Sequence, residues 1–183
     1  MEDNKIIELY FARNEAAISE TSCKYGHYCH AIAYNILFSE QDCQECLNDA
    51  YLHTWNCIPP ARPHSLRAFL GKITRNLALN FLEKKNAQKR GGGEVTIILG
   101  ELAECAASLD SFADELALSE IINKFLASLS AQSRKFFVGR YFYARSIKEI
   151  ARMYGVSENK VTVSLFRTRE KLREVLTKEG IDV

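Results

Sequence analysis

The sequence of 183 residues contains very little proline, no long apolar run and almost no net charge. Its three prolines, Pro59, Pro60 and Pro63, all lie in one short window, which leaves the remaining chain free of this helix breaker. No apolar run approaches the roughly 20 residues that cross a bilayer, and the N-terminus lacks the segments of a secretion signal. From these absences we expect a chain that neither spans a membrane nor is secreted, and therefore a cytoplasmic protein.

The net charge of +1, from 24 basic and 23 acidic residues, conceals strongly charged blocks. Residues 1–57 hold 3 basic and 9 acidic side chains, and residues 62–90 hold 8 and 1. Residues 94–120 hold 7 acidic and no basic side chains, whereas residues 134–173 hold 11 basic and 3 acidic ones. Two basic segments of this kind are typical of surfaces that contact nucleic-acid phosphates.

Helical periodicity on both sides of the proline window predicts an all-α fold. We expect a helix over residues 16–37, with Tyr28, Ile32 and Ile36 facing inward. A second helix has its buried stripe at Cys43, Cys46, Leu47, Ala50, Tyr51 and Thr54. A third, basic helix follows the prolines and runs from Leu66 to about Lys85, with Phe69, Leu70, Ile73 and Leu77 on its apolar face.

Three glycines, Gly91–Gly93, end this pattern because they favour no helical conformation. The acidic stretch that follows contains a short apolar run, Val95–Leu99, and is interpreted as a linker. Periodicity resumes at Leu116 and predicts about four more helices. The expected organisation is therefore two small helical domains, residues 1–90 and 116–183, joined by a linker over residues 91–115.

The strongest motif is a helix-turn-helix over residues 146–172. Ser146 and Glu149 have the spacing of a capping box, and Ser157 caps the second helix. Gly155 fits the left-handed turn between the helices. The buried positions are expected at Ile147, Ile150, Ala151, Tyr154, Val156, Val161, Leu165 and Leu172. Such a motif presents its second helix to the major groove of DNA; the alternative is a helical hairpin with a solvated charged face.

A second basic surface is expected where the proline-stiffened loop 58–65 meets the third helix. Arg62 and His64 lie in the loop, and Lys72, Asn76 and Asn80 recur at four-residue spacing along the helix, with Arg75 beside them. Cationic and amide groups together can bind phosphates and hydrogen-bond to unstacked bases. Judged alone, the helix is also compatible with an ordinary solvated face.

The cysteines are expected to remain free thiols in a reducing compartment. Cys43 and Cys46 fall within the apolar stripe of the second helix, which favours a packing role. A redox-sensitive thiol pair is one alternative. Another is a zinc site with further ligands from Cys23, His27, Cys29 and His30. Zinc usually requires its C-x2-C pair on a tight turn, so we expect no metal and no cofactor.

Signatures of catalysis are missing. The sequence contains no phosphate-binding glycine loop with its lysine, and its histidines form no H-E-x-x-H or nucleophile motif. We therefore expect a protein that is not an enzyme and has no small-molecule substrate.

A resemblance to region 2 of bacterial sigma factors lies in SEQDCQECLNDAYLHTWNCIPP, followed by FLGKITRNLALNFLEKKNAQKR. A resemblance to region 4 of the same family lies in LSAQSRKFFVGRYFYARSIKEIARMYGVSENKVTVSLFRTREKL. The two modules occur in the family's order, with a short linker and no region 3 between them, as in the extracytoplasmic-function (ECF) group. Together they cover residues 10–175.

The resemblance implies a transcription initiation factor with core RNA polymerase and promoter DNA as partners. Polymerase contacts are implied at Asp42, Glu45, Asn48, Asp49, Leu52 and Trp55. The melted −10 element is implied to contact Arg62, His64, Lys72, Arg75, Asn76 and Asn80. The −35 element is implied to contact Lys160, Thr162, Val163, Phe166 and Arg167, with Arg145 and Arg169 on phosphates.

Two departures from the family pattern are visible. Cys43 and Cys46 stand where the family usually has alanine and leucine or valine, which is a conservative core change. Thr162 stands where a basic residue is common, which leaves the −35 sequence open.

An anti-sigma factor is a further partner that the family often has. The main rival is a stand-alone helix-turn-helix repressor or activator with an N-terminal effector or dimerisation domain.

Overall fold

A computed structural model describes residues 1–88 and 115–179 of the chain. Within these ranges every regular element is helical and no strand occurs, which confirms the predicted all-α class. The chain divides into two compact units, Met1–Gly92 and Gly93–Val183. None of the helices in the described ranges combines the length and the apolar composition that crossing a membrane demands.

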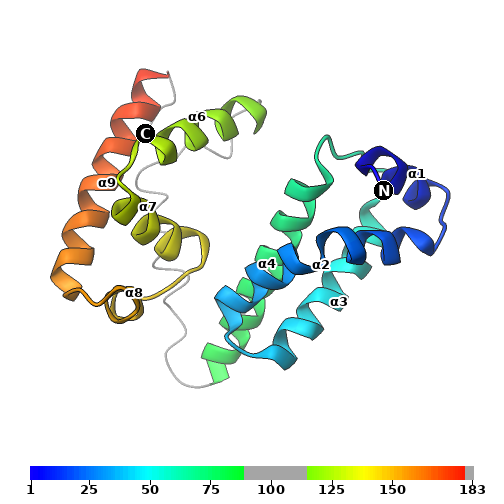
Figure 1. Cartoon of the computed structure of the whole chain (residues 1–183), viewed down its shortest axis with the longest axis horizontal. Helices are drawn as coiled ribbons and strands as arrows, with labels where there is room; N and C mark the ends of the chain where they lie inside the picture. Colours follow the sequence, from blue (N-terminus) through cyan, green and yellow to red (C-terminus); the bar gives the residue numbers. More distant parts are fainter. Residues whose placement is uncertain (89–114, 180–183) are drawn as a thin grey trace. The chain divides into compact units, whose positions relative to one another are not determined.

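The first unit is built from α1 (Asp3–Phe11), α2 (Ala16–Leu37), α3 (Glu40–Cys57) and α4 (Leu66–Gln88) (Figure 1). Each of the three longer helices packs against the other two, and α1 lies against α2. Their common core is filled by aliphatic and small side chains, among them Ile32, Ile36, Leu47, Ala50, Leu70 and Ala78.

Two of the predicted helices are confirmed closely. The helix expected over residues 16–37 has these same limits as α2 and ends at Phe38 in a left-handed conformation, with φ 52°. Ser39 then begins α3 by accepting a hydrogen bond from the backbone N–H of Asp42. All six residues of the predicted stripe from Cys43 to Thr54 are buried.

The basic helix predicted after the prolines is confirmed as α4. Leu66, Leu70 and Ile73 are buried as expected, whereas Phe69 and Leu77 are only half-buried. α4 approaches α2 closely at Gly71, where a Cβ atom would lie 2.5 Å from the hydroxyl oxygen of Tyr28. Tyr28 is half-buried, and the guanidinium of Arg67 lies 4.7 Å from the centre of its ring.

Helix α1 was not identified from the sequence pattern. It buries Ile6, Ile7 and Tyr10, and the hydroxyl groups of Tyr10 and Thr21 are 2.9 Å apart, which ties α1 to α2. At its start Asp3 accepts hydrogen bonds from Lys24 and Tyr25. Burial alone would raise the pKa of the Asp3 carboxyl, but these two hydrogen bonds hold it below its ordinary value.

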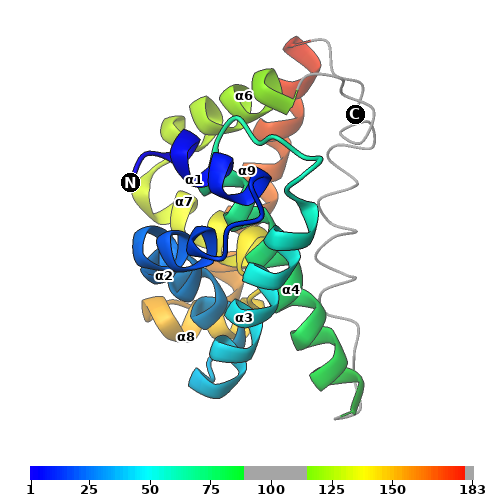
Figure 2. The same ribbon diagram turned by 90° about the vertical axis from the view of Figure 1, so that its right-hand side faces the viewer.

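The second unit contains α6 (Glu115–Ser128), α7 (Ala131–Phe137), the π-helix η2 (Val138–Phe142), α8 (Ile147–Tyr154) and α9 (Glu158–Lys178). The predicted helices after Leu116 correspond to α6, α7, α8 and α9, and η2 is an addition to them. Helices α7 and α8 both pack against α9, the long helix drawn in orange and red in Figure 2.

The predicted helix-turn-helix is formed by α8 and α9. Ser146 and Glu149 make the reciprocal hydrogen bonds of a capping box, Gly155 adopts the left-handed turn with φ 62°, and Ser157 caps α9. Five of the eight expected core positions are buried: Ile150, Ala151, Val161, Leu165 and Leu172. The other three, Ile147, Tyr154 and Val156, lie at the edge of this core and are half-buried.

The acidic linker expected over residues 91–115 and its apolar run Val95–Leu99 fall outside the described residues, apart from the first residue of α6.

Candidate nucleic-acid interface

The outward face of α9 carries most of the side chains predicted to contact duplex DNA. Five of the positions expected to contact the −35 element are exposed: Lys160, Thr162, Val163, Phe166 and Arg167. Val163 and Phe166 are large apolar side chains with 39% and 56% of their surface exposed. The hydroxyl of Thr162 donates to the Glu158 carbonyl within the helix. Helix α9 therefore offers a mixed cationic and apolar face, as expected of a groove-reading helix.

Arg145 does not have the exposure expected of a phosphate contact. Only 6% of its surface is exposed, and its Nη1 lies 3.0 Å from the sulfur of Met153. Its guanidinium also lies 5.2 Å from the centre of the Tyr143 ring. Ala144, just before it, adopts a left-handed conformation with φ 51°, and both residues are buried. The sequence does not indicate this conformation, because alanine rarely adopts a positive φ.

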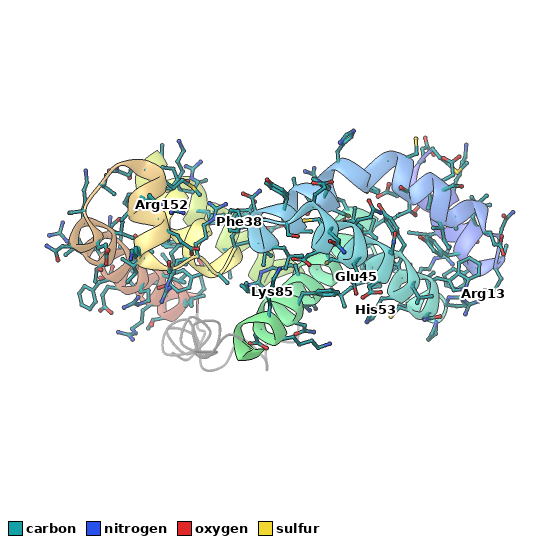
Figure 3. The ribbon with its side chains drawn as sticks, turned by 90° about the horizontal axis from the view of Figure 1, so that it is seen from below. Arg13, Phe38, Glu45, His53, Lys85 and Arg152 are labelled. Atoms are coloured by element: carbon teal, nitrogen blue, oxygen red, sulfur yellow. The ribbon has the colours of Figure 1, made fainter. Side chains whose placement is uncertain are left out.

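Arg169, the other predicted phosphate contact, is half-buried, and its Nη1 donates to the hydroxyl of Tyr141 at 2.8 Å. Two cations that were not among the predicted contacts are exposed instead. Lys148 and Arg152 lie four residues apart on α8, and Arg152 is labelled in Figure 3. The first helix of this motif crosses the DNA backbone. The signal was available, because both positions are two residues from the buried Ile150 and therefore lie on the opposite side of the helix from it.

In the first unit, the loop between α3 and α4 exposes Arg62 and His64 as predicted. The loop is anchored by Ile58, which is fully buried. Arg62 forms an ion pair with Glu8 of α1, and its guanidinium lies 5.1 Å from the centre of the Phe11 ring. These contacts with α1 were not expected from the sequence.

Helix α4 brings together three of the four side chains predicted on it. Lys72, Asn76 and Asn80 are exposed and share one face, since they are separated by four residues. Arg75 is half-buried, and this burial lowers the pKa of its guanidinium. An exposed row of one ammonium and two amides can bind phosphate and hydrogen-bond to bases.

The outer face of α3 exposes Glu45, Asn48, Asp49 and Leu52, four of the six predicted polymerase contacts. Asp42 is half-buried and pairs with Lys85 of α4. Trp55 is also half-buried, because it packs against Tyr10 and Arg13. Figure 3 labels Glu45 along α3 and Lys85 on α4. The exposed part of this face is acidic with one large apolar side chain.

The thiols of Cys29, Cys43 and Cys46 are fully buried in the first unit. Cys46 donates to the Thr74 carbonyl, and burial raises its pKa to about 12. Burial likewise raises the pKa of Cys29 and Cys43. Among the described residues, no group of three or more histidine, cysteine or acidic side chains is placed to hold a metal ion. The core position predicted for Cys43 and Cys46 is confirmed.

Comparison with known families assigns both units. Residues 24–88, which hold most of α2 and all of α3 and α4, match the family model of Sigma-70 region 2. Residues 119–172, from α6 into α9, match that of Sigma-70, region 4. The chain belongs to the sigma-70 family. In this sigma factor the two regions follow each other with residues 89–118 between them, the compact organisation of the ECF group.

Sigma-70 regions 2 and 4 belong to transcription initiation factors, which act with RNA polymerase on promoter DNA and are not enzymes. Among solved structures, the chain is similar to one titled "Structure of CnrH in complex with the cytosolic domain of CnrY". The identity is 19%, the alignment covers 96% of this chain and 97% of the other, and the TM-score is 0.42. At these values the likeness says nothing about function. No curated protein matches the sequence significantly.

Proposed function

We propose that this sigma factor binds core RNA polymerase and directs it to promoters by reading two separate elements. Region 4 reads the −35 element in the major groove, and region 2 captures the melted −10 element. The observation that carries the proposal is the exposed face of α9, where Lys160 and Arg167 flank Val163 and Phe166 in a matched region 4. Cations supply phosphate contact, and apolar and guanidinium groups discriminate base edges.

Region 2 has a surface suited to a single strand. The exposed groups of α4, Lys72, Asn76 and Asn80, continue from the loop that carries Arg62 and His64. An unstacked base offers hydrogen-bonding edges that amides can pair with, and the cations follow the phosphates. We propose that this surface stabilises the open promoter, whereas region 4 anchors the closed one.

The exposed residues of α3 are proposed to dock on core polymerase. Glu45 and Asp49 lie one turn apart and give this face its negative charge, and Leu52 adds an apolar contact with 59% of its surface exposed. A charged rim around an apolar anchor is a common design of protein interfaces. This role also implies a cytoplasmic location, where polymerase and chromosome are found.

The polymerase role is tested by charge reversal on α3. The double variant Glu45→Lys/Asp49→Lys should bind core polymerase roughly tenfold more weakly than the wild type, because complementary charge becomes repulsive. The control Glu2→Lys/Glu15→Lys changes the net charge equally at exposed positions outside α3 and should bind like the wild type. The measurement is a binding titration of labelled protein with core polymerase.

Binding measurements also distinguish the proposed sigma factor from the rival interpretation, a helix-turn-helix repressor. A repressor binds duplex DNA unaided, usually as a symmetric dimer on a palindrome. Failure of the wild type to bind core polymerase, together with tight autonomous binding to a palindrome, would favour the repressor and contradict the proposal. An anti-sigma factor is a further proposed partner, because members of the ECF group often have one. Co-purification with a candidate inhibitor tests this partner.

A further inference from the structure

Helix α1 makes a direct connection to the loop that the proposed function assigns to the −10 strand. Arg62, exposed in that loop, pairs through Nη2 with the Glu8 carboxylate. The same guanidinium lies 5.1 Å from the centre of the Phe11 ring. Glu8 and Phe11 are three residues apart and therefore lie on one side of α1. Two side chains of α1 thus hold the Arg62 guanidinium: Glu8 by an ion pair and Phe11 by a cation–π contact.

Helix α1 is itself fixed in place, so it can serve as a support. Its buried residues Ile6, Ile7 and Tyr10 face the unit's interior. Directly after the helix, Arg13 donates through Nη1 to the Trp55 carbonyl at 2.6 Å, near the end of α3. Residues 3–11 lie outside the matched region 2, which begins at residue 24. The contact therefore joins Arg62, inside the matched segment, to a helix outside it.

We infer that Glu8 competes with DNA for Arg62: it pairs with this guanidinium before promoter opening and gives it up to a phosphate of the unwound −10 strand. This inference rests on the proposed function of region 2. A carboxylate and a phosphate compete for the same guanidinium fork. Both partners of the present pair are more than half exposed, at 62% for Arg62 and 58% for Glu8. An exposed pair of this kind is weak enough to exchange partners.

The exchange has a measurable signature. In the wild type, part of the charge of Arg62 is already neutralised by Glu8 when the strand arrives. Removing the carboxylate charge leaves the full charge of Arg62 for the phosphates, so the strand binds more tightly and displaces more counterions. For Glu8→Gln we expect affinity for single-stranded DNA to rise about two- to fivefold. The slope of log affinity against log salt should steepen by up to about 0.7.

The experiment uses holoenzyme assembled from the full chain and core polymerase, with a fluorescent single-stranded oligonucleotide that carries the −10 sequence of a selected promoter. Affinity is measured over a series of salt concentrations for the wild type, Glu8→Gln, Arg62→Gln and the double variant. Glu2→Gln is the matched control, since Glu2 is an exposed acidic residue at the N-cap of α1 and makes no side-chain cap hydrogen bond.

The inference requires that Glu8→Gln tighten binding and steepen the slope, that Glu2→Gln do neither, and that the effect vanish when Arg62 is already glutamine. It is overturned if Glu8→Gln and Glu2→Gln behave alike, or if the Glu8 effect persists without Arg62. A merely structural role of Glu8 would not alter the salt slope through Arg62. Failure of wild-type holoenzyme to bind the strand would instead overturn the proposed function of region 2, and the inference with it.

Discussion

Gly71 of α4 leaves room for the ring of Tyr28 from α2 to lie against its backbone. A Cβ at this position would lie 2.5 Å from the Tyr28 hydroxyl oxygen and 3.3 Å from the adjacent ring carbon. Gly71→Ala therefore forces α2 and α4 apart or displaces the ring, and should lower the free energy of unfolding of the first unit by about 1–3 kcal/mol. Urea denaturation of the full chain measures this change.

Two variants make the Gly71 prediction specific. A Cβ atom on Gly26 of α2 would lie 3.6 Å from the Tyr51 hydroxyl oxygen, an ordinary contact distance, so Gly26→Ala should stabilise the unit by up to about 1 kcal/mol through helix propensity. Tyr28→Phe removes the clashing oxygen and should recover part of the loss caused by Gly71→Ala. An equal effect of alanine at both glycines would contradict this account of α2–α4 packing.

The thiols are predicted to differ sharply in reactivity. Only the thiolate is nucleophilic, and burial raises the pKa of Cys46 to about 12, so at pH 8 this thiol is neutral as well as inaccessible. Iodoacetamide should modify the exposed Cys23 within minutes, whereas Cys29, Cys43 and Cys46 should react only after unfolding. Peptide mapping by mass spectrometry measures each site. Rapid labelling of Cys43 and Cys46 in the folded protein would revive the redox-pair interpretation.

At the level of elements, α9 is predicted to carry promoter discrimination. Arg167 is exposed on the face that also presents Val163 and Phe166. Arg167→Ala should reduce discrimination between the promoter and a scrambled duplex by about 1–3 kcal/mol if it reads a base. Lys171→Ala, on an exposed position further along α9, is the control and should leave this ratio unchanged. Closed-complex affinities of holoenzyme measure both; an unaltered ratio for Arg167→Ala removes it from the readout.

Helix α4 is predicted to act at a later step. Asn80 is exposed on the face shared with Lys72 and Asn76. Asn80→Ala should leave closed-complex affinity intact and reduce the fraction of open promoter, because the proposed function assigns its amide to the bases of the melted strand. Asn56→Ala, an exposed asparagine of α3, is the control. Permanganate reactivity of unpaired thymines reports opening, and equal loss at both steps would contradict this division.

The elements that could be predicted are those with strong local signals. Periodicity predicted the limits of α2, and the caps at Ser146 and Ser157 predicted the turn at Gly155, because these features depend on residues close in sequence. Helix α1 is short and precedes the long periodic segment, and η2 continues α7 without a breaker, so neither left a clear pattern. The exposed face of α9 was predicted from its own stripe. The burial of Arg145 and Trp55 and the Glu8–Arg62 pair depend on tertiary contacts, which no local pattern contains.

For the whole molecule, the near-zero net charge of +1 is the sum of acidic and basic segments whose charges cancel. The acidic face of α3 and the basic faces of α4, α8 and α9 belong to separate helices with separate partners in the proposed function. An overall basic charge is therefore unnecessary for a protein that meets DNA together with polymerase. The distribution of charge along the chain, rather than its total, indicates the partners.

The most direct test of the central claim is promoter-specific transcription. Purified chain is mixed with core RNA polymerase and a library of promoter fragments, and run-off transcripts are sequenced. The account predicts transcripts from a subset of fragments that share a −35 and a −10 sequence, and none of these transcripts with core polymerase alone. Transcripts that are the same with and without the chain, under conditions where it is folded, would contradict its role as a sigma factor.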